Sequence, residues 1–148
     1  MLCCAWTIQA QHLSFHNISS NSQLPSGETR KLCQDSDGFL WIPTSNGLAR
    51  YDGYDFLFVK TDKSTRQQVL SGYVNLVSED SSGNLWIGTN NGLFLMDKET
   101  GNISKKLTPV MDNSHIEAVL SANDGTVWVA TNRGLFAILL ISEVFACW

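Results

Sequence analysis

The sequence has little of what most catalytic and metal sites require. Among its 148 residues are three histidines and four cysteines. It contains no Cys-x-x-Cys pair, no histidine pair at metal-ligand spacing and no glycine-rich phosphate loop with its lysine. His12, His16 and His115 stand apart from one another, and no pattern of serine, histidine and aspartate indicates a catalytic triad. We therefore expect no catalytic residues, no metal and no cofactor.

Positive charge is also scarce. Ten Lys and Arg residues against fourteen Asp and Glu residues give a net charge of −4, and the cations are scattered apart from Lys105 and Lys106. This argues against nucleic-acid binding. Cys3, Cys4, Cys33 and Cys147 occupy unrelated regions, so no disulfide framework can be inferred. The apolar run at 135–148 is too short for a membrane span.

The sequence does contain a motif of twelve residues that occurs three times. Its copies are Asp37–Leu48, Ser82–Leu93 and Asp124–Leu135, and their tryptophans lie 45 and 42 residues apart. A period of about 40 to 45 residues made of short strands is that of a β-propeller blade. Each copy therefore predicts one blade.

Each repeat reads as four strands separated by turns rich in Asp, Asn and Gly, which accept the positive φ of hairpin turns. The expected first strands are 29–34, 74–79 and 116–121. The second strands are expected at 39–43, 84–88 and 126–130. The third are expected at 48–51, 93–96 and 135–138, and the fourth at 54–59 and 103–107. Segments such as 39–42 and 93–96 are apolar on both faces, which predicts burial on both sides between neighbouring blades.

The length of the chain permits only part of a propeller ring. Rings close with typically 4 to 8 blades, and the sequence holds two full repeats and part of a third. We expect an all-β, incomplete ring of about two and a half to three tandem four-stranded antiparallel blades, from a truncated or frame-shifted reading frame; a genuine short protein is the alternative. The opening residues resemble the end of a secretory signal without its basic region, and a short first strand is the alternative there.

These observations divide the chain as follows: 1–10, a residual signal-like segment; 11–26, a lead-in; 27–71, repeat 1; 72–113, repeat 2; 114–138, partial repeat 3; 139–148, an aberrant apolar tail.

The repeat resembles a known family. The pattern Asp-x-x-Gly-x-Leu-Trp-Ile-Gly-Thr-x-x-Gly-Leu, matched almost completely by Asp80–Leu93, is similar to the two-component regulator propeller repeat. Leu24–Gly27, Gln34–Ile42 and Gly47–Tyr54 are similar to the first blade of a hybrid histidine-kinase sensor. Pro43 departs from the family pattern, because glycine usually stands there.

The resemblance implies a periplasmic sensor module that detects glycan-derived oligosaccharides and signals to a kinase across the membrane. The kinase portion and the remaining blades would be partners outside this sequence, and the chain itself is expected to lack kinase activity. Two alternatives stay open: a structural or protein-binding propeller, and a quinoprotein-like enzyme propeller, whose Asp-x-x-Thr-Gly turn occurs once, at Asp97–Gly101. Uncovered blade faces at the two ends predict self-association.

The candidate residues fall into two groups. The structural anchors are tryptophans expected to pack between blades and turn glycines, namely Trp41, Trp86, Trp128, Gly38, Gly83 and Gly125. The candidate ligand residues are polar side chains on one rim and on the first strands, which can hydrogen-bond a sugar: Asn46, Asn90, Asn91, Asn132, Arg133, Arg30, Asn75 and Glu117. At each of these positions the alternative is that the residue only shapes a turn.

Overall fold

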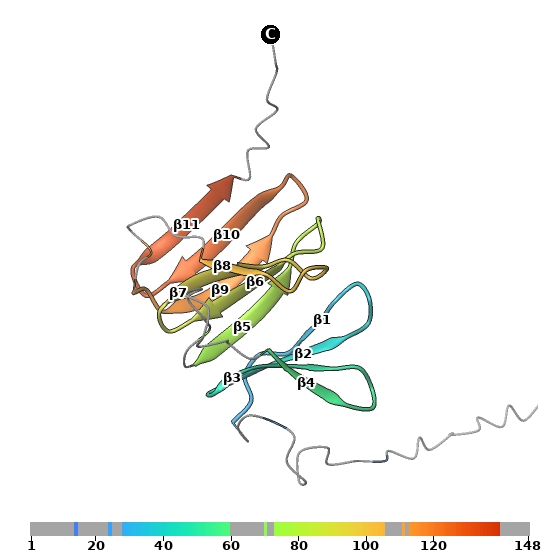
Figure 1. Ribbon diagram of the computed structural model, residues 1–148. Coiled ribbons are helices and arrows are strands. Elements are labelled where there is room, and N and C mark those ends of the chain that lie inside the picture. Colours follow the sequence, from blue (N-terminus) through green and yellow to red (C-terminus); the bar gives the residue numbers. More distant parts are fainter. Residues whose placement is uncertain are drawn as a thin grey trace, which may run out of the picture.

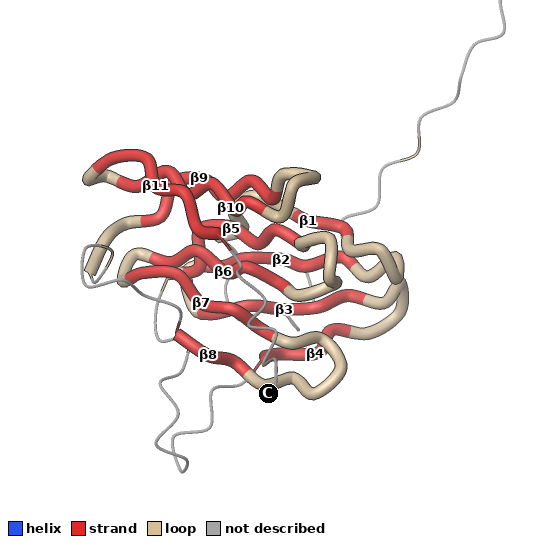
Figure 2. The backbone as a smooth tube through the Cα atoms, turned by 90° about the horizontal axis from the view of Figure 1, so that it is seen from above, coloured by secondary structure: helices blue, strands red, loops and turns tan. Residues whose placement is uncertain are grey.

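Three antiparallel sheets follow one another along the chain (Figures 1 and 2). The computed structural model describes residues 14, 24, 28–59, 70, 73–105, 111 and 113–139, and no helix occurs among them. Each sheet corresponds to one sequence repeat, so the predicted all-β arrangement of tandem blades is confirmed. The proposed signal-like segment and the predicted tail beyond Leu139 lie outside the described residues, as do parts of the loops between blades, whereas Leu139 itself ends the last strand.

Within each blade, successive strands pair in sequence order. Blade 1 comprises β1 (Cys33–Gln34), β2 (Leu40–Thr44), β3 (Gly47–Tyr51) and β4 (Phe56–Val59). Blade 2 comprises β5 (Val74–Glu79), β6 (Leu85–Thr89), β7 (Gly92–Met96) and β8 (Ile103–Lys105). Blade 3 comprises β9 (Ile116–Ser121), β10 (Thr126–Thr131) and β11 (Gly134–Leu139), and its described residues form three strands.

The first strand of blade 1 is shorter than predicted. Only Cys33 and Gln34 form regular strand, whereas Thr29 and Lys31 make isolated bridges to Thr44 and Leu76. Pro43 accounts for part of the difference, because it lies in the neighbouring strand and has no N–H to donate to the ladder. Its carbonyl oxygen still accepts the backbone N–H of Arg30 at 2.8 Å.

The turns between first and second strands need a residue with positive φ in each blade. Gly38, Gly83 and Gly125 supply it, with φ of 90°, 81° and 84°. In blades 1 and 2 an aspartate also organises the turn: Oδ1 of Asp35 and of Asp80 accepts two backbone N–H groups at 2.9 to 3.1 Å. The predicted turn glycines therefore occupy the left-handed region that other residues rarely adopt.

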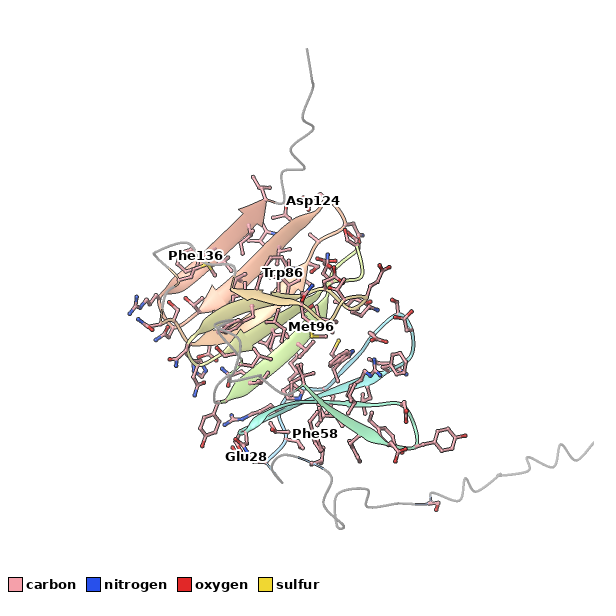
Figure 3. All side chains as sticks on the ribbon, in the orientation of Figure 1. Glu28, Phe58, Trp86, Met96, Asp124 and Phe136 are labelled. Carbon is pink, nitrogen blue, oxygen red and sulfur yellow. The ribbon has the colours of Figure 1, made fainter. Side chains whose placement is uncertain are left out.

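Two hydrophobic cores hold the blades together, one at each interface. Between blades 1 and 2 lie Trp41, Leu48, Val74, Val77, Leu85, Ile87, Phe94 and Met96, together with Leu70. Between blades 2 and 3 lie Leu76, Trp86, Leu93, Ile116, Val127 and Val129, together with Met111. Figure 3 labels Met96 on the side of blade 2 that faces blade 1 and Trp86 on the side that faces blade 3. Blade 2 is thus covered on both faces, and all five residues of β6 are buried.

Among the described residues, blade 3 is covered on one face only, as the sequence predicts for a blade at the end of an incomplete ring. Its outer face exposes Leu120, Leu135 and Leu139 by 64%, 66% and 67%. Trp128 lies on that same face and is 41% exposed, whereas Trp41 and Trp86 are 3% and 0% exposed. The reason is geometric: Trp41 packs toward blade 2 and Trp86 toward blade 3, but no described blade covers Trp128. The expectation that it packs between blades is therefore wrong within the described residues.

Candidate functional site: the inner-strand mouth

The candidate ligand residues lie where the innermost strands begin. β5 lies beside β1 on one side and β9 on the other, so the starts of neighbouring blades come together at one rim. Glu28, Tyr73 and His115 occupy equivalent positions just before the strands. Arg30, Asn75 and Glu117 occupy equivalent positions two residues later. These six residues, with Asn90 and Asn132 from the adjacent turns, are called the inner-strand mouth.

A β-bulge fixes the position of the predicted first-strand residues. In blade 2, Val74 pairs with Thr89 and Leu76 with Gly88, which leaves Asn75 without a partner in the ladder. In blade 3, Ile116 pairs with Thr131 and Ala118 with Ala130, which leaves Glu117 in the same situation. Bulges re-aim side chains and occur often beside functional sites. The repeated bulge therefore places one polar residue of blade 2 and one of blade 3 at the mouth.

Hydrogen bonds join the mouth across blades 2 and 3. Nδ2 of Asn75 donates to Oδ1 of Asn90 at 3.0 Å and to the carbonyl oxygen of Ile116 at 3.2 Å, and it lies 3.5 Å from Nε2 of His115. Oδ1 of Asn132 accepts the backbone N–H of His115 at 3.1 Å. Asn75, Asn90 and Asn132 thus form one connected polar surface.

Charged and aromatic groups extend this surface. The Arg30 guanidinium lies 5.8 Å from the centroid of the Tyr73 ring, an arrangement favoured by the ring quadrupole. Arg30 also pairs with Glu28 at 3.0 Å. On blade 3, Nε2 of His115 lies 3.5 Å from a carboxylate oxygen of Glu117. Tyr73 remains 42% exposed, so part of its ring is open to solvent.

The rim turns are built by a repeated threonine. The hydroxyls of Thr44, Thr89 and Thr131 donate to the glycine carbonyl three residues later at 2.8 to 3.1 Å. The same hydroxyls accept the backbone N–H groups two residues later, at 3.0 to 3.1 Å, from Asn46, Asn91 and Arg133. These three predicted residues have exposed side chains on the same rim.

Sequence reasoning did not include Tyr73 or His115 among the candidate ligand residues. The structure places both in the inner-strand mouth, with Glu28 as their equivalent in blade 1. Their signal in the sequence was positional, since each stands two residues before a predicted polar first-strand residue. It was easily missed because three unlike residue types fill the equivalent positions.

On the opposite rim, Lys98 clamps blade 2 to blade 1. Its Nζ lies 2.7 Å from Asp37, 2.5 Å from Glu79 and 3.8 Å from the buried Asp35. Ser36 donates its backbone N–H and its hydroxyl to Glu79, both at 2.7 Å. Partial burial raises the pKa of Glu79, but hydrogen bonds from Lys98 and Ser36 outweigh it and hold that pKa below its usual range. Figure 3 shows Glu28 and Asp124 at the two opposite rims.

Two buried aspartates hold the tryptophan anchors. Nε1 of Trp41 donates to Oδ2 of Asp35 at 2.7 Å, and Nε1 of Trp86 donates to Oδ2 of Asp80 at 3.0 Å. The equivalent position in blade 3 is Ala122, so Trp128 has no such acceptor there. The aspartate six residues before each buried tryptophan is the sequence signal for this bond.

The described parts of the chain hold neither a cluster of metal ligands nor a membrane-spanning helix. Within residues 28–59, 73–105 and 113–139, no three His, Cys, Asp or Glu side chains are placed to hold a metal ion. No helix there is long and apolar enough to span a bilayer. Cys33 is unbridged, and its partial burial raises the pKa of its thiol.

A comparison with known protein families finds a match to two segments of the chain. The model of the two-component regulator propeller matches residues 23–46 and 68–91. No curated protein matches the chain.

Solved structures share the fold. The extracellular domain of a hybrid two-component system from B. thetaiotaomicron is 26% identical with a TM-score of 0.66, over 80% of this chain and 16% of that one. A second such domain from the same organism is 16% identical with a TM-score of 0.55, over 88% of this chain and 24% of that one. Virginiamycin B lyase from Staphylococcus aureus is 16% identical with a TM-score of 0.56, over 81% of this chain and 44% of that one.

The two extracellular domains are much longer than the part that this chain matches. Blades 1 and 2 contain the matched segments, with the tryptophan, turn glycine and threonine in equivalent places. Residues 23–46 and 68–91 thus match the two-component regulator propeller repeat.

Proposed function

We propose that this chain is part of the extracellular, ligand-sensing propeller of a hybrid two-component signalling protein and has no kinase activity of its own. The observation that carries the proposal is the regulator propeller match together with the likeness to extracellular domains of such systems. The proposal includes export to the periplasm. The kinase portion and the further blades are proposed partners of the described blades.

We further propose that the ligand is an oligosaccharide bound at the inner-strand mouth. Exposed amides of the kind found at Asn90 and Asn132 donate and accept hydrogen bonds, as sugar hydroxyls require. The open part of the Tyr73 ring offers an apolar surface for the C–H face of a pyranose. Arg30 and Glu117 add a donor and an acceptor of opposite charge, which suits a ligand with many hydroxyl groups.

A protein-binding propeller is the second candidate, and one observation favours it. The outer face of blade 3 exposes Leu120, Trp128, Leu135 and Leu139, and exposed apolar faces of this kind mark protein contacts. An enzyme propeller has less support. The likeness to the lyase, at 16% identity, concerns the fold alone, and the Asp-x-x-Thr-Gly turn occurs once.

Calorimetric titration with defined oligosaccharides tests the sensing proposal. The panel should contain neutral and uronic-acid oligosaccharides, and the wild type should be compared with Asn75→Ala and Asn90→Ala. We expect at least one oligosaccharide to bind and each variant to raise its dissociation constant by about two- to ten-fold, since one lost hydrogen bond is worth roughly 0.5–1.5 kcal/mol.

Asn102→Ala on the opposite rim is the matched control and should bind like the wild type. The sensing proposal fails if no oligosaccharide binds. The assignment to the mouth fails if binding occurs and neither mouth variant changes it. Arg133→Ala then reports whether the exposed turns take part, with weaker binding of uronic-acid ligands as the expected result.

A further inference from the structure

A cleft of about 500 Å³ lies between blades 1 and 2, on the rim opposite the inner-strand mouth. Trp41, Val59 and Met96 contribute apolar surface to it, and Asp37, Glu99 and Thr100 contribute polar groups. Its volume falls within the range of roughly 300–1,000 Å³ that is typical of small-molecule sites. We call it the inter-blade cleft.

Arg50 is the unusual residue of the inter-blade cleft. It pairs across the strands with Trp41 and Leu57, on the face of blade 1 that looks toward blade 2. The equivalent residues are Leu95 in blade 2 and Ala137 in blade 3, which also pair with their blade's tryptophan. A guanidinium therefore stands where the other two repeats have an apolar side chain.

The Arg50 guanidinium lies against an aromatic ring, but one of its N–H donors has no acceptor among the described residues. Its Cζ lies 4.3 Å from the centroid of the Phe39 ring, within the range of a cation–π contact. Its Nε is buried and has no hydrogen-bond partner in the described part of the chain. Backbone N–H groups of Asp55 and Tyr54 hold the pKa of Asp52 low and the charge of Arg50 adds to this, but no hydrogen bond joins Asp52 to Nε. A buried donor without an acceptor is costly, so a ligand oxygen that displaces the groups covering Nε would stabilise it.

The charges around the inter-blade cleft indicate what kind of oxygen fits. Lys98 already faces Asp35, Asp37 and Glu79, and Glu99 adds a fourth carboxylate. Carboxylates thus outnumber the two cations, which disfavours an anionic ligand. The same carboxylates accept hydrogen bonds from hydroxyl groups, while Arg50 donates to hydroxyl oxygens. The pattern of donors, acceptors and apolar surface fits a neutral polyhydroxylated molecule.

We propose that the inter-blade cleft binds a neutral sugar unit, with Arg50 as the principal donor to its hydroxyl oxygens and Glu99 and Thr100 as its hydroxyl partners. This site shares a ligand class with the proposed function but none of its residues. It lies on the other rim and depends on contacts between two blades rather than on the inner strands. A ligand there contacts both blades and strengthens their association.

Heteronuclear NMR titration of the chain with methyl glycosides of glucose, galactose, mannose and glucuronic acid tests the proposal. The Arg50 Nε–H signal, identified by its absence in Arg50→Met, should shift saturably with at least one neutral glycoside, together with the amides of Leu57 and Thr100. Arg50→Met should raise the dissociation constant by about ten-fold or more, because hydrogen bonds to a charged donor are worth roughly 1.5–3 kcal/mol. Glu99→Gln should weaken binding without disturbing the packing of Trp41.

Controls separate this site from the inner-strand mouth. Arg30→Met should leave the shifts at Leu57 and Thr100 unchanged, and Asn75→Ala should do the same. The inference is overturned if no neutral glycoside moves the Arg50 Nε–H signal, if the glucuronide binds more tightly than every neutral glycoside, or if the shifts persist in Arg50→Met. Shifts confined to the mouth would overturn it while supporting the proposed function. Shifts confined to the cleft would support it and count against the mouth.

Discussion

Truncating Trp86 and Trp128 in turn measures how much each blade interface contributes to stability. The two residues occupy equivalent positions in their repeats, but Trp86 is fully buried against blade 3 and Trp128 is 41% exposed. Replacing a buried tryptophan by alanine typically costs about 3–5 kcal/mol. Trp86→Ala also leaves Oδ2 of the buried Asp80 without its donor, which adds roughly 1–3 kcal/mol. The sum approaches the whole stability of a small domain, about 5–15 kcal/mol.

Trp128→Ala should cost far less. Its side chain is only partly removed from water, and Ala122 stands where the other repeats have the aspartate, so no acceptor is orphaned. We expect a loss below about 2 kcal/mol, because area burial accounts for most of the effect. Trp86→Phe keeps the ring but removes the indole N–H, and it should cost about 1–3 kcal/mol. Urea denaturation followed by circular dichroism measures the free energy of unfolding of all three variants. Equal losses for Trp86→Ala and Trp128→Ala would refute the inference that Trp86 is buried between two blades and Trp128 is not.

Three further predictions concern contacts between blades and with solvent. Gly88→Ala should destabilise by about 1–3 kcal/mol, because a Cβ there would lie 2.7 Å from Cγ2 of Ile116 in blade 3; an unchanged denaturation midpoint would contradict this packing. The pKa of Glu79 is lowered in the folded chain, so its contribution is present above its unfolded value near 4.5 and is lost as the pH falls through the folded value. Lys98→Met should therefore flatten the loss of stability below about pH 4.5, and an unchanged pH profile would argue against the clamp. Finally, Leu135→Asp should reduce self-association in sedimentation, because Leu135 is 66% exposed on the uncovered face of blade 3; a wild type that is already monomeric would remove that face as a contact.

The bounds of two first strands could be predicted closely. The predicted bounds of β5 and β9 match the structure, because a buried apolar residue begins each strand and a glycine turn follows it. β1 was predicted too long, since a sequence pattern does not register that Pro43 removes a donor from the neighbouring ladder. Burial of Trp128 was also mispredicted, because the repeat pattern reports which face a residue occupies but not whether a neighbour covers it.

The candidate site was predictable in part. The sequence indicated Arg30, Asn75 and Glu117 as polar residues on apolar strands, and the structure places them together at the start of those strands. The bulges that expose Asn75 and Glu117 could not be predicted, because they depend on pairing between strands. The Lys98 clamp escaped prediction for a similar reason: its carboxylates come from two repeats and approach one another only when the blades stack.

Amide hydrogen exchange of the chain with and without a bound oligosaccharide tests the central claim most directly. If the inner-strand mouth is the sensing surface, the ligand should slow exchange at 73–75, 115–117 and the turn at 90–91, and leave the turn at 123–125 on the opposite rim unchanged. Slowed exchange confined to that opposite rim, or to the outer face of blade 3, would contradict the claim.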